Sequence, residues 1–280
     1  MDTAIAHGFL LLAQNLWNKG EKPNFKEYHN WGGWTPVHKA ARNGYIDTLK
    51  WIFAEDVLPQ CVLDIKNHNG RTPLDVAIEE GKLEVAKFLF EKGGRPNLEI
   101  NKMRTPVHWA AYCGYTAVLK WALENNVLPL STLNVKEHDS KWTPLDCIIE
   151  YGRLEMMQYL WEMGGRPNLD IYRDGNFTPV HQAARYGKTT NLKWVFENKV
   201  LPWSVLHIKD KGKKTPLDWA IINRQWETAV FIQCFFIDLV FLAMQRAKRD
   251  HRCVLRRLPN ELLDMVVEEV AVRFDLKVVW

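Results

Sequence analysis

The sequence predicts an all-α solenoid, in which short helix-turn-helix units stack side by side. The main observation is the dipeptide Thr-Pro, which occurs six times in 280 residues at intervals of 33 to 38 residues. A period of this size is typical of repeat architectures. A second observation is that the copies alternate between two kinds, so that the true unit is a pair of about 72 residues. The six dipeptides begin at Thr35, Thr72, Thr105, Thr143, Thr178 and Thr215.

The two kinds of copy are called His-type and Asp-type below. In a His-type copy Thr-Pro is followed by Val-His and Ala-Ala, and the copy closes with Leu-Lys-Trp and Val-Leu-Pro. In an Asp-type copy Thr-Pro is followed by Leu-Asp, and two of these copies close with Gly-Gly-Arg-Pro-Asn-Leu. The defining residues are His38, His108 and His181 in the first kind and Asp75, Asp146 and Asp218 in the second.

The amino-terminal residues fit the same frame. Residues from Asp2 to Asn24 align with an Asp-type copy at a constant offset of 73 residues. The chain therefore starts inside a copy that lacks its Thr-Pro turn. We expect this partial repeat to cap the stack, because a terminal repeat has only one neighbour to pack against.

The residues of a single copy predict its two helices. Thr35 is a suitable N-cap, and Pro36 suits the first helical position, where no N–H is needed. Gly44 can adopt the left-handed conformation with which helices often end. Apolar residues from Ile46 to Phe53 then recur at helical spacing, which predicts a second amphipathic helix. Neither helix can bury its apolar face alone, so we expect the core to lie between copies.

The composition is that of a folded protein, with 47% hydrophobic and 25% charged residues. The net charge of +4, with acids and bases mixed, does not indicate a nucleic-acid partner. The five cysteines are scattered and form no Cys-x-x-Cys pair, which argues against a zinc site or a disulfide framework and for a reducing intracellular compartment. The apolar stretch from Ala229 to Met244 is short for a bilayer span and contains Gln233 and Asp238, so a buried helix is expected rather than a membrane helix.

No motif for catalysis or cofactor binding is found. The sequence has no phosphate-binding glycine loop, no nucleophile elbow and no metal-ligand spacing. The three Asp-type carboxylates are about 70 residues apart, so they do not form a paired acid–base site. We therefore predict a protein that is not an enzyme and that has no cofactor and no metal.

With these motifs the chain resembles the ankyrin repeat, whose pattern is Gly-x-Thr-Pro-Leu-His-x-Ala-Ala-x-x-Gly followed by a Leu-rich helix. The resemblance implies an ankyrin array over residues 1–235, a partial first repeat followed by six repeats, in which the recurrent His is structural and ties neighbouring repeats together. The sequence departs from the family pattern in three ways. Asp replaces His in every second copy, the loops after Val-Leu-Pro are long, and a usual Leu is replaced at Trp51, Trp121 and Trp194. These tryptophans are expected between repeats.

The resemblance also implies where a protein partner binds. In the ankyrin architecture the residue before Thr-Pro lies at an exposed turn, and the two residues between Ala-Ala and Gly line the concave face. Aromatic and arginine side chains at such places are typical of binding hot spots; the alternative is that some of them pack on adjacent turns. The predicted partner-binding residues are Trp34, Arg71, Arg104, Trp142, Phe177 and Lys214 at the turns, and Arg42, Asn43, Tyr112, Cys113, Arg185 and Tyr186 on the concave face.

The repeat pattern weakens after Thr215, and residues 236–280 are predicted to form a helical extension. Pro259 is a good first helical residue, and Leu262, Val266 and Val270 share one face of the helix that follows. From about residue 256 the segment resembles the first helix of an F-box, as in the shortened box, called PRANC, of ankyrin proteins from poxviruses and other large DNA viruses. The resemblance implies that a cullin ligase adaptor binds Leu258, Pro259, Glu261, Leu262 and Val266.

Two main functions remain open, beside a third class, membrane-tethered binding through the stretch from Ala229 to Met244. The first is a substrate-recognition adaptor of a cullin-type ubiquitin ligase, with a protein target held on the repeats. The second is a plain ankyrin scaffold or inhibitor whose carboxyl-terminal helices only cap the solenoid. A SOCS box, another ligase box that follows ankyrin arrays, is supported only by the spacing of Leu239 and Ala243.

The expected setting of the protein is intracellular. We expect a monomer in the cytoplasm, in a host cell if the protein is viral. The basic stretch from Arg246 to Arg257 is either a solvated linker or a signal that directs the protein to the nucleus as well.

Overall fold

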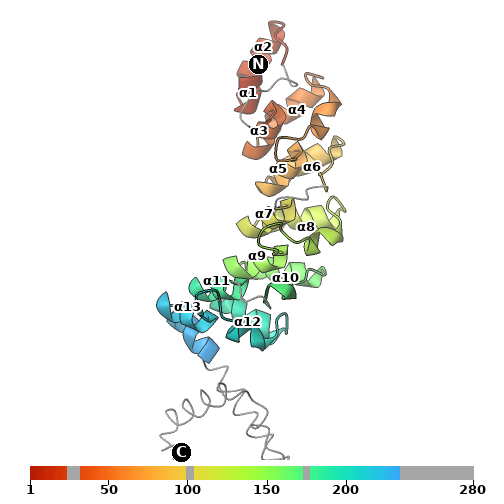
Figure 1. Cartoon of the computed structure of the whole chain (residues 1–280). Coiled ribbons are helices and arrows are strands. Elements are labelled where there is room, and N and C mark those ends of the chain that lie inside the picture. Colours follow the sequence, from red (N-terminus) through yellow and green to blue (C-terminus); the bar gives the residue numbers. More distant parts are fainter. Residues whose placement is uncertain (24–31, 99–103, 173–176, 234–280) are drawn as a thin grey trace, which may run out of the picture. The chain divides into compact units, whose positions relative to one another are not determined.

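The computed structural model describes residues 1–23, 32–98, 104–172 and 177–233 (Figure 1). The chain divides into two compact units, a first unit of Met1–Ile171 and a second unit of Tyr172–Trp280. Every regular element in the described ranges is a helix, and no strand occurs in them. The predicted all-α class is therefore confirmed.

Each copy contributes a pair of α-helices. In the first unit these are α1 (Asp2–Ala6), α2 (Leu10–Asn18), α3 (Pro36–Asn43), α4 (Ile46–Ala54), α5 (Pro73–Glu79), α6 (Leu83–Glu91), α7 (Pro106–Cys113), α8 (Thr116–Glu124), α9 (Pro144–Tyr151) and α10 (Leu154–Glu162). In the second unit they are α11 (Pro179–Arg185), α12 (Thr189–Glu197) and α13 (Pro216–Ile222), after which a further helix begins at Trp226 and is described as far as Gln233.

The first helix of every Thr-Pro copy begins in the same way. The threonine side chain accepts a hydrogen bond from the backbone N–H three residues later, and the side chain of that later residue accepts one from the threonine N–H. This is a capping box in which His or Asp takes the place of the usual Glu. Two otherwise unsatisfied donors are thereby used at each helix start, which explains the regularity of the six helix starts.

The helices form two layers within the first unit. The first helices α1, α3, α5, α7 and α9 each pack on the next, and behind them α4 packs on α6 and α6 on α8 (Figure 1). In the second unit α11 packs on both α12 and α13. The alanine pairs of the first helices, such as Ala40 and Ala41, are fully buried, because small side chains let neighbouring helices approach closely. Leu49 and Leu119 of the second helices are fully buried as well, and since helices of successive copies pack on one another, the core lies between copies as predicted.

The His-type copies are longer than the Asp-type copies because they contain an additional short helix. The interval from a His-type Thr-Pro to the next is 37 or 38 residues, against 33 and 35 from an Asp-type one. The additional residues follow Val-Leu-Pro and form 3₁₀ helices, η1 (Gln60–Asp64), η2 (Leu130–Asn134) and η4 (Trp203–His207). A further 3₁₀ helix, η3 (Leu169–Tyr172), follows the second Gly-Gly-Arg-Pro-Asn segment.

The tryptophans of Leu-Lys-Trp lie at the edge of the core. Trp51, Trp121 and Trp194 are each partly exposed. The ring of Trp121 on α8 meets Phe90 on α6 of the preceding copy edge-on, with ring centroids 6.0 Å apart. This is the contact between copies that the sequence predicts for these residues, made here by a half-buried ring.

Two predictions concern the end of the chain. Among the described helices, none is long and apolar enough to cross a bilayer. The predicted helix from Ala229 to Met244 runs past Gln233, and so it lies partly outside the described residues. The predicted helical extension, residues 236–280, lies wholly outside them.

A glycine tests how closely successive copies pack. Gly81 has φ +69°, and a Cβ added there would lie 2.5 Å from ring atom Cγ of Tyr115 in the next copy. We expect Gly81→Ala to lower the free energy of unfolding by about 2 to 4 kcal/mol, from left-handed strain and a steric clash together. Gly20 is the control, since its φ is +87° but no heavy atom lies within 4 Å of an added Cβ. Gly20→Ala should cost only about 1 kcal/mol in urea unfolding, and equal losses in the two variants would contradict close packing at Tyr115.

Candidate functional site

The histidine of each His-type copy joins its copy to the following turn. The Nδ1 atom of His38 accepts the backbone N–H of Thr35 at 3.3 Å, so Nδ1 carries no proton. The proton therefore lies on Nε2, which donates to the carbonyl oxygen of Arg71 in the next copy at 2.9 Å. His108 donates in the same way to the carbonyl of Trp142 at 3.1 Å, and His181 to the carbonyls of Lys214 at 3.2 Å and Ile208 at 2.9 Å. Both ring nitrogens are used, which confirms the structural role expected of these residues.

Burial keeps these imidazoles neutral. It lowers the pKa of His38 and of His108 to about 4, and it lowers the pKa of His181 in the same direction. At neutral pH each ring is an uncharged hydrogen-bonded link. Among the described residues, no group of His, Cys, Asp and Glu side chains is placed to hold a metal ion.

The aspartate of an Asp-type copy makes a different link. Asp75 Oδ2 accepts the backbone N–H of Thr72 at 2.9 Å and that of Asn97, in the loop that closes the same copy, at 3.0 Å. The Asn97 side chain in turn donates to the carbonyl oxygen of Gly70 at 2.7 Å. The asparagine therefore binds the helix start through its backbone and the preceding turn through its side chain. Burial raises the pKa of Asp75 to about 6, even though these donors favour its charged form.

The second Asp-type copy repeats this arrangement. Asp146 accepts the N–H of Asn168 at 2.9 Å, and the Asn168 side chain donates to the carbonyl of Lys141 at 2.8 Å. The alternation in the sequence therefore reflects two links of opposite polarity. A histidine N–H needs an acceptor, which the next turn supplies, whereas a carboxylate needs a donor, which the Gly-Gly-Arg-Pro-Asn loop supplies.

Arg71 extends these links into a network, and its predicted place on the surface is wrong. Only 3% of Arg71 is exposed. Its Nε atom pairs with the Glu79 carboxylate, and its Nη2 atom donates to the carbonyl oxygen of Arg104 in the next copy. The side chain turns inward because Glu79 and that carbonyl bind two of its three nitrogens. Burial raises the pKa of Glu79 to about 8, against the lowering effect of the Arg71 guanidinium.

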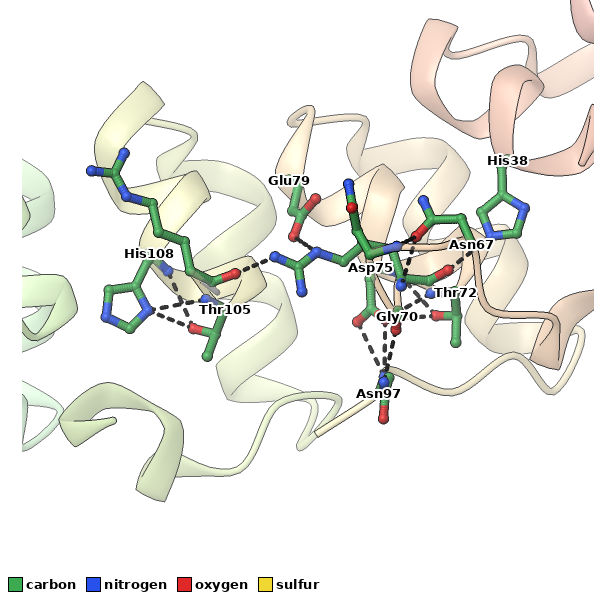
Figure 2. A network of polar contacts seen from close by, with 12 residues as sticks. His38, Asn67, Gly70, Thr72, Asp75, Glu79, Asn97, Thr105 and His108 are labelled. Atoms are coloured by element: carbon green, nitrogen blue, oxygen red, sulfur yellow. Dashed lines mark hydrogen bonds and ion pairs between the residues drawn. The ribbon is translucent and has the colours of Figure 1, made fainter. Parts of the chain in front are cut away.

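The network runs along the first unit from one His-type copy to the next. Figure 2 shows it between His38 and His108, with Asp75, Glu79 and Asn97 between them. Since His38 binds the carbonyl of Arg71 and the Arg71 side chain binds that of Arg104, buried polar contacts join three successive copies. Arg71 is therefore a structural residue and is removed from the predicted binding surface.

One pair of positions on the concave face repeats with different chemistry. The first member of the pair is the residue directly after Ala-Ala in a His-type copy. The second member lies in the next copy, two positions after the place equivalent to Ala-Ala. In the first pair Arg42 Nε lies 3.2 Å from Glu80 Oε1. In the second pair the rings of Tyr112 and Tyr151 meet at a centroid distance of 4.2 Å. The repeat frame is thus constant here while the exposed chemistry varies.

The turn residues before Thr-Pro lie against the histidine links. The Trp34 ring meets His38 edge-on at 6.0 Å, and the Arg42 guanidinium lies 5.4 Å from the Trp34 centroid. Phe177 stacks on His181 at 5.4 Å in the second unit. These aromatic rings therefore shield the links as well as facing outward.

Arg104 occupies the same turn position and has another role. Its Nε donates to Glu137 Oε1 at 2.8 Å, and its guanidinium lies over the rings of Trp109 and Tyr112, at 5.4 and 5.1 Å. Beside them, burial raises the pKa of the Cys113 thiol, which keeps the thiol protonated. This part of the surface is a packed cation–aromatic cluster.

The remaining predicted partner-binding residues reach the surface to different extents. Arg42, Asn43 and Tyr186 are exposed, whereas Trp34, Arg104, Tyr112, Cys113, Trp142, Phe177, Arg185 and Lys214 are half-buried. The predicted adaptor-binding residues Leu258, Pro259, Glu261, Leu262 and Val266 lie outside the described residues.

Sequence reasoning missed the partners of these residues. Glu79, Glu80, Glu137, Tyr151 and Trp219 all contact predicted site residues. Four of the five follow Thr-Pro in an Asp-type copy. The alignment that selects Arg42 and Asn43 in the His-type copies selects Glu79 and Glu80 when it is applied to the Asp-type copies. Glu137 lies in a turn, and no repeat position marks it.

Paired helices, capped starts and buried links between copies define a helical repeat protein whose variable side chains lie along its first helices. A family model described as ankyrin repeats (3 copies) matches residues 1–102 and 93–171. The chain therefore belongs to the ankyrin-repeat family. Ankyrin repeats are protein-interaction modules and are typically not enzymes, which gives the chain a protein-binding role.

Known proteins are similar to parts of the chain. It is 30% identical over 195 residues to human transient receptor potential cation channel subfamily A member 1, which covers 68% of this chain and 17% of that protein. It is 29% identical over 162 residues to an ankyrin-repeat protein of fowlpox virus, which covers 58% and 35%. The chain spans between 16% and 54% of the length of five curated relatives.

A solved structure supports the fold. The crystal structure of the human ASB11 ankyrin repeat domain superposes with a TM-score of 0.58 at 23% identity, over 80% of this chain and 94% of that one. At this identity the likeness shows the fold alone, which is the ankyrin solenoid that the sequence predicts.

The neutral histidine links predict a pH dependence of stability. The folded state holds His108 neutral with a pKa of about 4, while the unfolded state binds a proton below its ordinary pKa of about 6.5, so stability falls as pH falls from 6.5 toward 4. His108→Gln cannot titrate. The wild type should therefore lose about 2 kcal/mol of unfolding free energy relative to this variant when the pH falls from 7.5 to 5.

Urea unfolding at the two pH values measures this difference. His38 and His181 titrate in both proteins and cancel. A constant difference between the His108→Gln variant and the wild type would mean that His108 is not held neutral.

Proposed function

We propose that this ankyrin-repeat protein is a substrate-recognition adaptor of a cullin-type ubiquitin ligase. The observation that carries the proposal is the F-box-like run Leu-Pro-Asn-Glu-Leu-Leu from Leu258 to Leu263 behind an ankyrin array. In this proposal Leu258, Pro259, Glu261, Leu262 and Val266 bind the ligase adaptor. The similarity to a fowlpox virus ankyrin protein supports a viral setting, in which such an arrangement is typical.

The target would be held on the turns and the concave face. The residues proposed to contact it are those predicted from the sequence, with Arg71 removed because it is buried. Arg42, Asn43 and Tyr186 are the most accessible of them. Side chains of this kind, arginine and tyrosine beside half-buried tryptophan, are common in binding hot spots.

The proposed setting is a monomer in the cytoplasm or nucleus of a cell. Cys61, Cys113 and Cys147 are free thiols, which suits a reducing compartment. No cofactor and no nucleic acid is part of the proposal.

A second candidate function is a plain ankyrin scaffold or inhibitor whose last residues cap the solenoid. One observation favours it. At the carboxyl end of the described second unit, the apolar side chains of Ile221, Ile222, Trp226 and Val230 are exposed. Exposed apolar groups in one place usually indicate a covering partner, and in this alternative residues 236–280 are that cover.

A single substitution in the F-box-like run separates the two functions. We expect the full chain to capture a purified F-box-binding adaptor, and we expect Leu262→Asp to weaken capture by about tenfold or more, as for loss of a buried hot-spot side chain. Asp264→Lys is the matched control, because residue 264 lies on the opposite face of the predicted helix. It should leave capture unchanged.

The melting curve of each variant completes the test. A variant that loses capture but keeps the unfolding midpoint of the repeats supports the adaptor function. If the wild-type chain captures no adaptor, and Leu262→Asp lowers the midpoint instead, the segment is a cap and the adaptor proposal is wrong.

A further inference from the structure

The two units differ in charge. In the described part of the second unit, residues 177–233, nine basic and four acidic side chains give a net charge of +5. In residues 1–23, 32–98 and 104–171 of the first unit, seventeen basic and nineteen acidic side chains give −2. The modest net charge of the whole chain therefore hides a positive second unit.

The difference arises at equivalent positions of the repeat. Arg42 pairs with Glu80 in the first unit, and the equivalent residues of the second unit are Arg185 and Asn223. Arg71 pairs with Glu79, and the equivalents are Lys214 and Ile222. Both cations are kept and both carboxylates are lost. Within the part of the chain that the structure describes, neither Arg185 nor Lys214 has a carboxylate partner for its charged group.

The two unpaired cations are held on one tryptophan. The Arg185 guanidinium and the Lys214 ammonium each lie 5.2 Å from the ring centroid of Trp219. The ring is fixed in turn, since its Nε1 donates to Asp210 at 2.8 Å and Phe177 meets it edge-on at 5.2 Å. Trp219 therefore holds both cations against one ring, which reduces the entropy that a ligand would lose in ordering them.

Further positive charge lies on the turn that leads to Lys214. This turn is closed by hydrogen bonds between the backbones of Asp210 and Lys214, at 2.9 Å, and of Lys213 and Asp210, at 2.8 Å. Lys209, Lys211 and Lys213 on it are exposed. Arg185 also lies 5.5 Å from the ring centroid of Tyr186, half of which is exposed.

No acidic side chain in residues 177–233 forms an ion pair with the charged group of Arg185 or Lys214. Asp210 accepts the Lys214 backbone N–H and the Trp219 N–H, Asp218 caps the helix start at Thr215, and Glu227 pairs with Lys193 at 3.4 Å. Glu197, the fourth acidic residue of this range, ends α12 and is exposed. A carboxylate that neutralises Arg185 and Lys214 must then come from outside these residues.

We propose that this cationic surface, formed by Arg185, Lys214, Tyr186 and the lysines at 209, 211 and 213, binds an acidic segment of a protein target. Carboxylates of the segment would pair with Arg185 and Lys214, and an apolar side chain would contact Tyr186. This inference rests on the proposed role of the repeats in holding a target. It does not depend on the ligase adaptor.

The chemistry favours a protein segment over a nucleic acid. Single-stranded nucleic acids bind by stacking their bases on open aromatic faces. Here Arg185 and Lys214 lie over the Trp219 ring, and its edge is bound to Asp210. The surface presents cations backed by aromatic rings, which suits the pairing of carboxylates.

Fluorescence anisotropy with the full chain at low salt tests the inference. The probe is a fluorescein-labelled peptide of Asp and Glu with one central Phe, and its counterpart has Asn and Gln in place of the acids. We expect the acidic peptide alone to bind, and Arg185→Glu and Lys214→Glu each to weaken binding by about tenfold or more. Lys193→Glu is the control in the same unit, because Lys193 lies outside the cationic surface and already pairs with Glu227, and it should change binding by less than about twofold.

Three outcomes would overturn the inference. The first is no binding of the acidic peptide beyond that of its neutral counterpart. The second is an equal effect of Lys193→Glu and Arg185→Glu. The third is tighter binding of labelled oligothymidine than of the acidic peptide, which would make the surface a nucleic-acid site. Adaptor capture is measured on the same preparations. If the chain binds the acidic peptide but captures no adaptor, this inference stands and the adaptor function fails. If it captures the adaptor but does not bind the peptide, this inference alone is wrong.

Discussion

The structure depends on one buried side chain in each copy, the residue three positions after the Thr-Pro threonine. This residue is His or Asp in all six Thr-Pro copies. It is fully buried in five of them, and only Asp218 is partly exposed. A buried polar group without a hydrogen-bond partner costs about 1 to 3 kcal/mol. Each such residue must therefore find both its own threonine and a partner of the right polarity in a turn or loop. The polarity of that partner decides whether the copy carries His or Asp.

Several other features follow from this constraint. The Asp75 and Asp146 copies close with a Gly-Gly-Arg-Pro-Asn loop because the asparagine N–H binds the carboxylate, as Asn97 does with Asp75 and Asn168 with Asp146. His-type copies place the donor on the ring and use a carbonyl of the next turn, so their closing segment is free to form a 3₁₀ helix instead. The links fix the spacing of the copies, while side chains on the outer positions vary between ion pairs, stacked rings and unpaired cations.

The fold was predictable from the sequence because the local signals agree with one another. Thr-Pro sets the helix start, Ala-Ala allows close packing, and the 33 to 38 residue period gives the stack. The candidate surface was less predictable, because exposure depends on partners that are distant in sequence. Arg71 has the same turn position as Lys214, yet Glu79 and the Arg104 carbonyl draw Arg71 inward. The two cations that lie against Trp219 likewise come from different elements, Arg185 from the end of α11 and Lys214 from the turn before α13. No single motif marks them as neighbours.

The substitution His108→Asp tests the central claim most directly, by urea unfolding at neutral pH. An aspartate at residue 108 could cap Thr105 as well as Asp75 caps Thr72, so the helix start alone would tolerate the change. Its carboxylate would, however, face the carbonyl oxygen of Trp142 where it needs a hydrogen-bond donor. The copy that contains residue 108 has no Gly-Gly-Arg-Pro-Asn loop to supply that donor. The account predicts a loss of about 3 kcal/mol or more in the free energy of unfolding. A loss of less than about 0.5 kcal/mol would show that the two residue types are interchangeable and would contradict the account.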